Sequence, residues 1–144
     1  MILCHFRDEV RSVEQPRLLI VDDDQDLIDL LTETFESQGY AVECALDVCG
    51  ACAYLDNGSQ MPDVIILDLV LPDGDGYELC SRITASDRTR EIPVVLLTAK
   101  TSLNNRVRGF VTGARKYITK PFDIDYLLEA VESLLPRERA ESEN

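Results

Sequence analysis

Between residues 17 and 136 the chain alternates short apolar runs with longer amphipathic segments. Each run is bounded by polar or turn-forming residues, which is typical of buried strands in a parallel sheet. The runs cover residues 18–21, 41–45, 64–67, 93–97 and 116–119. Because each run is followed by a helical pattern, the sequence predicts an α/β fold, with helices on both faces of a parallel sheet.

The amphipathic segments carry signals for helix ends. Acidic residues stand where a helix cap is expected, and glycine or proline marks most of the ends. Apolar side chains at helical spacing define one face of each helix, as Leu103, Val107, Phe110 and Val111 do in the fourth. We predict helices from Asp24 to Gly39, from Asp47 to Gly58, from Asp75 onward, from Leu103 to Gly113 and from Asp123 to Pro136.

Four of the predicted strands end directly before charged or hydroxyl-bearing side chains. Asp22 and Asp23 follow the first strand, Asp68 the third, Thr98 the fourth and Lys120 the fifth. Parallel strands all point the same way, so we expect these side chains to meet at one edge of the sheet. That edge is where open α/β sheets place their ligand sites.

These positions also carry the motifs of a known family, in the same order. The motifs are Asp22-Asp23, Leu67-Asp68-Leu69 with Pro72-x-Gly74, Leu97-Thr98-Ala99 and Tyr117-x-x-Lys120-Pro121-Phe122. The chain resembles the receiver domains of two-component response regulators, in particular the single-domain regulators of chemotaxis. The resemblance implies a flavodoxin-like sheet of strand order 2-1-3-4-5, flanked by five helices. The resemblance covers residues 17–136, the expected receiver domain. Residues 1–16 show no clear periodicity and are expected to form an N-terminal arm, and residues 137–144 are expected to form a charged C-terminal tail.

The resemblance implies that Asp68 accepts a phosphoryl group, since a carboxylate can attack phosphorus to form an acyl phosphate. Three carboxylates in one pocket repel one another, and a divalent cation removes that repulsion. Mg²⁺ suits such a site because carboxylates, waters and a substrate phosphate are its usual ligands. By resemblance, Asp23 and Asp68 bind Mg²⁺ directly, Asp22 acts through a water, and the carbonyl of Val70 completes the protein ligands.

The other motif residues have implied roles in catalysis and switching. Lys120 is expected to place a positive charge beside the phosphoryl oxygens, and Thr98 to donate a hydroxyl hydrogen bond to them. In the family the equivalent of Thr98 moves toward the phosphate and the aromatic at the position of Tyr117 swings inward. This motion changes the surface of the fourth helix, the fifth strand and the fifth helix. The Lys120–Pro121 bond is expected to be cis.

The charge and hydropathy of the chain indicate which classes of partner to expect. The 144 residues carry a net charge of −13, which disfavours direct binding of nucleic acid because such binding relies on Lys and Arg. No apolar run is long enough for a membrane span, and the N-terminus lacks a secretory signal, so we expect a cytoplasmic protein without membrane contact. The resemblance implies a sensor histidine kinase or histidine phosphotransfer protein as donor and a protein effector downstream. It leaves homodimerisation open.

Two other interpretations concern metal or redox chemistry. Asp22, Asp24, Asp26 and Glu33 match acidic positions of an EF-hand calcium loop, although Leu27 stands where that loop requires glycine. The C-x-x-C pair of Cys49 and Cys52 matches a redox or zinc motif. It is better interpreted as two small helix residues, because the predicted cap at Asp47 places both in the first turns of a helix.

Two alternative functions also stay open. A receiver could act purely as a docking module, without phosphotransfer. An aspartate phosphatase acting on external substrates is disfavoured, because the segment after Asp68 lacks the second carboxylate of an Asp-x-Asp motif. Arg115 and Lys116, with Arg106 and Arg108 nearby, further predict a basic patch that could dock an acidic partner surface.

Overall fold

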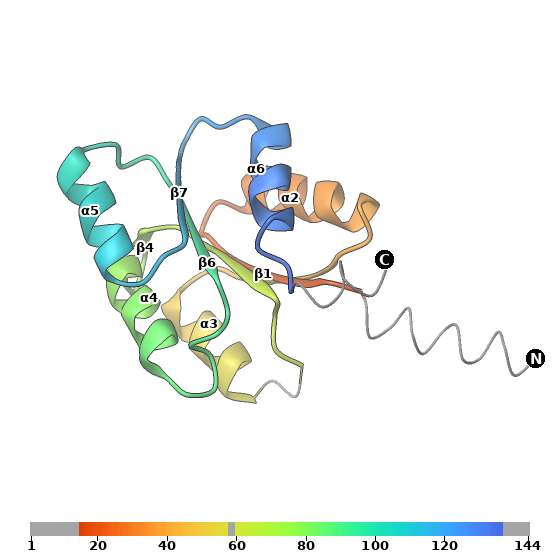
Figure 1. The fold of residues 1–144 in the computed structure, drawn as a ribbon. Helices are drawn as coiled ribbons and strands as arrows, with labels where there is room; N and C mark the ends of the chain where they lie inside the picture. The colour runs from red at the N-terminus through yellow and green to blue at the C-terminus, as the bar shows by residue number, and fades with distance from the viewer. Residues whose placement is uncertain (1–14, 58–59, 137–144) are drawn as a thin grey trace, which may run out of the picture.

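The computed structural model describes residues 15–57 and 60–136. At its centre lies a parallel sheet of five strands in the order β2-β1-β3-β6-β7 (Figure 1). The strands are β1 (Arg17–Val21), β2 (Ala41–Ala45), β3 (Val64–Leu67), β6 (Val94–Thr98) and β7 (Lys116–Thr119). Numbered along this sheet alone, the order is the predicted 2-1-3-4-5, so the fold class is confirmed.

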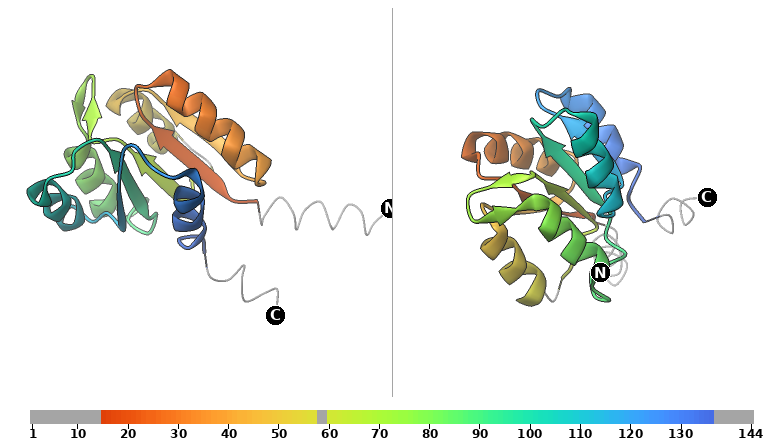
Figure 2. Two further views of the ribbon diagram at one scale, coloured as in Figure 1. Left: turned by 90° about the horizontal axis from the view of Figure 1, so that it is seen from above. Right: turned by 90° about the vertical axis from the view of Figure 1, so that its left-hand side faces the viewer.

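The described helices cover both faces of the sheet (Figure 1, Figure 2). They are α2 (Gln25–Ser37), α3 (Val48–Asn57), α4 (Gly76–Ala85), α5 (Leu103–Val111) and α6 (Ile124–Glu132). Successive side chains of a strand point to opposite faces, and β1 illustrates the consequence. Leu18 and Ile20 pack in the apolar core beneath α2 and α6, whereas Leu19 and Val21 pack in the core beneath α3 and α4.

Local sequence explains where the helices begin and end. The predicted acidic caps are confirmed, because each accepts a hydrogen bond from a backbone N–H in the first turn of its helix. These caps are Asp24 for α2, Asp47 for α3, Asp75 for α4 and Asp123 for α6. Gly39 and Gly113, which follow α2 and α5, have φ angles of +95° and +105°. Glycine adopts this left-handed conformation without steric cost.

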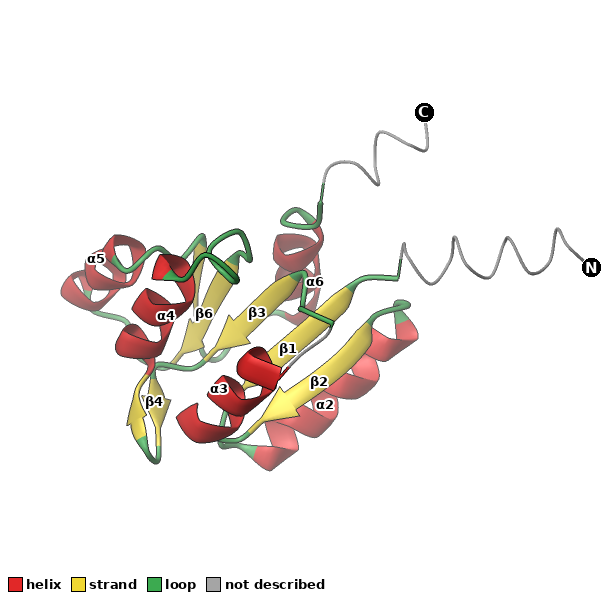
Figure 3. Cartoon of the chain, turned by 90° about the horizontal axis from the view of Figure 1, so that it is seen from below, coloured by secondary structure: helices red, strands yellow, loops and turns green. Residues whose placement is uncertain are grey.

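The segment after β3 differs from the prediction. Where the pattern of apolar runs predicted no strand, the chain forms a short antiparallel hairpin of β4 (Val70–Leu71) and β5 (Gly74–Asp75). This hairpin extends beyond the end of β3, next to the start of α4 (Figure 3). Two-residue strands give almost no periodic signal, which is why the sequence pattern did not reveal them.

Two helices also differ in detail. α6 ends at Glu132, before the predicted end at Pro136, because Leu134 and Leu135 donate to carbonyls three residues back instead of four. In α5 the apolar residues that defined the predicted helix lie largely in solvent, with exposed fractions from 51% to 79%: Leu103, Val107, Phe110 and Val111. The buried residue of α5 is Gly109.

The predicted tail and most of the predicted arm lie outside the described residues, as does the predicted end of the second helix at Gly58. Among the residues that the structure does describe, no helix is both long and apolar enough to cross a membrane.

Candidate functional site

The register of the sheet brings the predicted acidic residues together. Val21 of β1 pairs with Leu67 of β3, so the residues that follow these two strands are neighbours. The backbone N–H of Asp68 donates to the carbonyl of Val21 at 2.9 Å, which continues the strand pairing beyond the end of β3. Asp22 and Asp68 therefore lie side by side at the carboxyl edge of the sheet, as predicted.

Asp22, Asp23 and Asp68 form an acidic cluster whose carboxylate oxygens lie within 4.8 Å of one another. Asp22 is 3% exposed and Asp68 7% exposed, whereas Asp23 faces solvent. Backbone N–H groups orient the buried pair: Asp24 donates to Oδ1 of Asp22 at 2.9 Å, and Val70 donates to Oδ1 of Asp68 at 3.1 Å. Several oxygen donors close together, one of them open to water, fit the ligand preference of Mg²⁺.

Lys120 faces this cluster from the end of β7. Its Nζ donates to Oδ2 of Asp22 at 2.9 Å and to Oδ2 of Asp68 at 3.0 Å. Burial acts to lower the pKa of Lys120, but the hydrogen bonds and negative charges of both carboxylates outweigh it and raise that pKa. Burial raises the pKa of Asp22, against the opposing effect of Lys120. A protonated Lys120 thus holds two buried carboxylates that would otherwise repel each other.

The predicted switch residues lie on neighbouring strands. Thr98 is fully buried at the end of β6, and its carbonyl accepts a hydrogen bond from the Lys120 N–H at 2.8 Å. Tyr117 is 8% exposed, and its hydroxyl donates to the carbonyl of Lys100 at 2.8 Å. Burial is the main cause that raises the pKa of Tyr117 to about 12. The tyrosine side chain is thus directed inward here, and the Lys120–Pro121 bond is cis, as expected.

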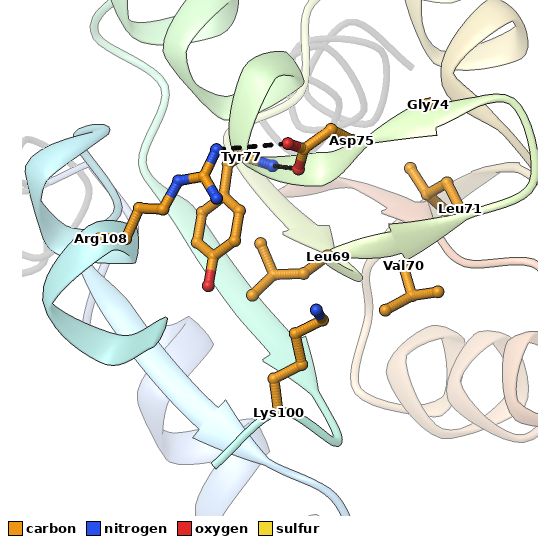
Figure 4. A pocket seen from close by; sticks show the side chains of 8 residues that line it. All are labelled: Leu69, Val70, Leu71, Gly74, Asp75, Tyr77, Lys100 and Arg108. Carbon is orange, nitrogen blue, oxygen red and sulfur yellow. Dashed lines mark hydrogen bonds and ion pairs between the residues drawn. The ribbon is translucent and has the colours of Figure 1, made fainter. Parts of the chain in front are cut away.

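A cavity of about 230 Å³ lies beside the segment that directly follows Asp68. Figure 4 shows the residues that line it. The cavity is bounded by the β4–β5 hairpin, α4, the segment after β6 and α5, with the lining residues Leu69, Val70, Leu71, Gly74, Asp75, Tyr77, Lys100 and Arg108. The Arg108 guanidinium lies 4.1 Å from the centroid of the Tyr77 ring and pairs with Asp75 at 3.3 Å. The hydroxyl of Tyr77 also donates to Oδ1 of Asn105 at 2.7 Å.

These cavity contacts join the start of α4 to α5, and sequence reasoning missed them. The partners are 28 to 33 residues apart in the chain. At such separations no local motif signals the pairing.

The EF-hand interpretation is wrong. Asp24 caps α2 with its side chain, and Glu33 lies within the same helix. A strand, β1, precedes these residues where an EF-hand would have a helix. Cys49 and Cys52 lie in α3 as free cysteines, which agrees with the helix interpretation of that pair.

The predicted basic patch is only partly available to a partner. Arg108 is paired with Asp75, and the Arg106 guanidinium lies 5.5 Å from the centroid of the Tyr117 ring. Each of these two arginines thus directs its positive charge toward a group of the same molecule. Arg115 is exposed and Lys116 half-buried on β7 and the turn before it.

Comparison with known proteins identifies the family. The family model of the response regulator receiver domain matches residues 18–132. The chain therefore belongs to the receiver-domain family of two-component response regulators. The members of this family are signalling switches and not classical enzymes.

Individual relatives agree with this assignment. The chain is 42% identical over 122 residues to the DNA-binding dual master transcriptional regulator RpaA of Synechocystis sp., covering 85% of this chain and 50% of that protein. It is 36% identical over 126 residues to the phosphate regulon transcriptional regulatory protein PhoB of Rhizobium meliloti, covering 88% and 55%. The chain thus spans about half the length of these curated relatives.

Solved structures show the same fold. A putative response regulator from Chloroflexus aurantiacus J-10-fl superposes with a TM-score of 0.78 at 33% identity, over 84% of this chain and 98% of that one. A CheY-like receiver domain protein from Methanospirillum hungatei JF-1 gives a TM-score of 0.78 at 31% identity, over 90% and 99%.

Proposed function

We propose that this receiver domain takes a phosphoryl group onto Asp68 from a phosphohistidine of a sensor histidine kinase or a histidine phosphotransfer protein. The observation that carries the proposal is the placement of Lys120, whose ammonium lies within 3.0 Å of carboxylate oxygens of both Asp22 and Asp68. A nucleophile, further metal-ligand oxygens and a fixed positive charge thereby surround one point at the sheet edge. Phosphoryl transfer depends mainly on such positioning and charge neutralisation.

In the proposed reaction a carboxylate oxygen of Asp68 attacks the phosphorus atom while the P–N bond to the donor histidine breaks. The electron pair of that bond stays with the ring nitrogen, and a donor ring protonated on its other nitrogen leaves as neutral imidazole. The product is an acyl phosphate on Asp68. Lys120 would donate to one phosphoryl oxygen and the Thr98 hydroxyl to another, so both residues stabilise the added negative charge.

Asp22, Asp23, Asp68 and the carbonyl of Val70 are the groups that would hold Mg²⁺. When bound, the cation would neutralise the carboxylates and the charge on the phosphoryl oxygens. The protein's own contribution is to hold the two buried carboxylates in fixed orientations through the N–H groups of Asp24 and Val70.

The proposed output passes from Thr98 and Tyr117 to the surface formed by α5, β7 and α6. A phosphoryl group adds roughly −1.5 to −2 units of charge, which would draw the Thr98 hydroxyl toward it. Tyr117 lies directly beneath α5, with the Phe110 ring centroid 6.4 Å from its own. A shift of Thr98 and Tyr117 would therefore alter how α5 presents its exposed apolar side chains to a protein effector or a second copy of the chain.

The proposed output partner is a protein, not nucleic acid. RpaA is named a DNA-binding regulator, but this chain corresponds to about half of that protein. The net charge of −13 would repel a phosphate backbone.

A phosphorylation-independent docking module remains the second candidate function. Burying carboxylates costs free energy, and a surface used only for docking gains nothing from that cost. The buried pair of Asp22 and Asp68 therefore favours phosphotransfer.

The test is phosphorylation by acetyl phosphate or phosphoramidate with Mg²⁺, followed by intact-protein mass spectrometry. We expect the wild-type protein to gain one phosphoryl group and to lose it on hydroxylamine treatment, which cleaves acyl phosphates. Asp68→Asn should gain none, while Asp87→Asn, an exposed aspartate elsewhere on the surface, should behave as wild type. A wild-type protein that stays unmodified by both donors and by a cognate kinase would leave the docking function in its place.

A further inference from the structure

The β4–β5 hairpin, which begins two residues after Asp68, is tied at its tip to the start of α3. The Asp73 carboxylate accepts hydrogen bonds from the backbone N–H of Val48 at 2.7 Å and of Cys49 at 2.9 Å. Each carboxylate oxygen takes one of the two bonds. Asp73 therefore binds two N–H groups at the start of a helix that lies 24 to 25 residues earlier in the chain.

The residue next to Asp73 packs against the same point. A Cβ atom placed on Gly74 would lie 3.0 Å from Cγ2 of Val48 and 3.6 Å from its Cβ. A longer side chain at position 74 would push the hairpin away from α3. The hairpin tip is thus held by two hydrogen bonds, from Val48 and Cys49, and by close packing against Val48.

α3 does not need Asp73 for an ordinary cap. The first residues of a helix present backbone N–H groups without partners inside the helix. Asp47 already accepts from the Gly50 N–H at 2.7 Å, as a local N-cap does. The bonds from Asp73 come from a distant segment, so their distinctive effect is on the placement of the hairpin.

The other end of the hairpin contacts the phosphorylation site. The N–H of Val70 in β4 donates to Oδ1 of Asp68 at 3.1 Å, and Val70 pairs with Asp75 across the hairpin. The Val70 carbonyl is also one of the groups proposed to hold Mg²⁺. A displacement of the hairpin tip would therefore change the orientation of the Asp68 carboxylate and the position of the Val70 carbonyl, a proposed metal ligand.

We propose that Asp73 is a positioning residue that holds the β4–β5 hairpin against α3 and thereby fixes Val70 beside Asp68. The inference deepens the proposed phosphotransfer function and rests on it for its effect on Mg²⁺. Asp73 is fully exposed, yet its two backbone donors hold its pKa below the usual range. The carboxylate is thus charged at neutral pH. Its negative charge strengthens the hydrogen bonds that it accepts from N–H groups at the helix N-terminus.

The experiment compares Asp73→Ala with the matched control Asp47→Ala. Each variant removes side-chain hydrogen bonds from the start of α3, but only Asp73→Ala releases the hairpin. We expect both to lower the urea midpoint of unfolding. Mg²⁺ affinity, measured by isothermal titration calorimetry, should weaken by about tenfold in Asp73→Ala, as for the loss of a group that orients metal ligands. It should stay within about twofold of wild type in Asp47→Ala.

Asp73→Asn separates hydrogen bonding from charge. Like alanine, asparagine removes the negative charge, but its side-chain oxygen can still accept a bond from α3. We expect an Mg²⁺ affinity between those of wild type and Asp73→Ala. Equal losses in the two variants, with the hydrogen exchange of the Val70 amide unchanged in both, would show that only the charge matters and would overturn the positioning role.

Hydrogen exchange supplies a readout that needs neither metal nor phosphorylation. In Mg²⁺-free buffer the Val70 amide should exchange faster in Asp73→Ala than in wild type or Asp47→Ala, because its bond to Asp68 is less well held. Unchanged Val70 exchange and unchanged Mg²⁺ affinity, in a wild-type protein that accepts phosphate, would refute the role of Asp73 alone. A wild-type protein that neither binds Mg²⁺ nor accepts phosphate would instead refute the proposed function.

Discussion

Lys120 forms ion pairs with two buried carboxylates at once. Its side chain is 23% exposed, and it pairs with two carboxylates whose side chains are only 4% and 9% exposed. Buried charges are tolerated only when they are paired and hydrogen-bonded. The charges of the cluster therefore affect the stability of the fold as well as the proposed phosphotransfer. A cation bound there would neutralise part of the negative charge that Lys120 balances.

The substitution Lys120→Met should destabilise the fold by about 1–3 kcal/mol at neutral pH, because it leaves two adjacent buried carboxylates without their cation. Urea unfolding measures the loss. Saturating Mg²⁺ should restore part of the lost stability, since the ion replaces the missing positive charge. A loss that Mg²⁺ does not reduce would argue against a metal site at this cluster.

Tyr117 links stability to alkaline pH. Its pKa is raised from 10 to about 12, first by burial and then by neighbouring Tyr77. Because the unfolded chain releases this proton near pH 10 while the folded protein keeps it, the stabilisation is complete below pH 10 and is lost toward pH 12. Tyr117→Phe should therefore lose less stability than wild type over this range, by on the order of 1–2 kcal/mol. Urea unfolding across the range tests this, and parallel pH profiles would contradict a buried Tyr117 hydroxyl. The pKa of Tyr40 is also raised to about 12. Because Tyr40 is present in both proteins, its contribution cancels in the comparison.

At the scale of elements, α5 is unusual because it meets the sheet through a glycine. A Cβ on Gly109 would lie 2.8 Å from Cδ1 of Leu96 and 2.9 Å from Cδ2 of Tyr117. Such distances are too short for carbon atoms, so even alanine would force α5 or the Tyr117 ring to move. The close approach of α5 to the sheet thus depends on the absence of a side chain at position 109.

We expect Gly109→Ala to destabilise the protein by about 1–3 kcal/mol through overpacking, although alanine is the better helix former. Urea unfolding checks the prediction. Val111→Ala is a suitable control on the same helix, because Val111 is 79% exposed and its truncation should change stability by less than about 0.5 kcal/mol. A Gly109→Ala protein as stable as wild type would mean that α5 can separate from β7 at little cost.

At the scale of the whole molecule, exposed apolar side chains gather at the α5 end of the sheet. The α2 and α6 side packs large residues such as Phe35 and Leu127 completely. The α5 end of the other side instead leaves apolar side chains in solvent. Contiguous exposed apolar surface is typical of interaction sites, which supports α5 as part of the proposed output surface.

Phosphorylation or beryllofluoride with Mg²⁺ should strengthen association of the protein with itself or with an effector through this surface. Phe110→Asp should weaken that association by more than about tenfold, because it places a charge in an apolar contact. Labelling of Asp68 should be unaffected. Leu30→Asp is the matched control, since Leu30 on α2 is 52% exposed and Phe110 51%. Sedimentation velocity, alone and with a candidate effector, checks the result, and equal behaviour of the two variants would exclude α5 from the interface.

Much of the fold was predictable because it depends on local patterns. The apolar runs identified every strand of the main sheet, and the caps at Asp24, Asp47, Asp75 and Asp123 were found where a cap was expected. Parallel pairing then required the strand ends to share one edge. That rule of topology predicts that Asp22 and Asp68 lie together.

Sequence by itself therefore determined the α/β class, the family and the chemical identity of the acidic site. Tertiary structure alone decided which surfaces those elements present. It turned the apolar positions of α5 outward, folded the segment after Asp68 into a hairpin, and joined Asp73 to α3 and Arg108 to Asp75. The reason is physical: strands and caps are selected by interactions between near neighbours in sequence. The contacts of Asp73 with α3 and of Arg108 with Asp75 join residues 24 to 33 positions apart, where only the packed geometry selects the partner.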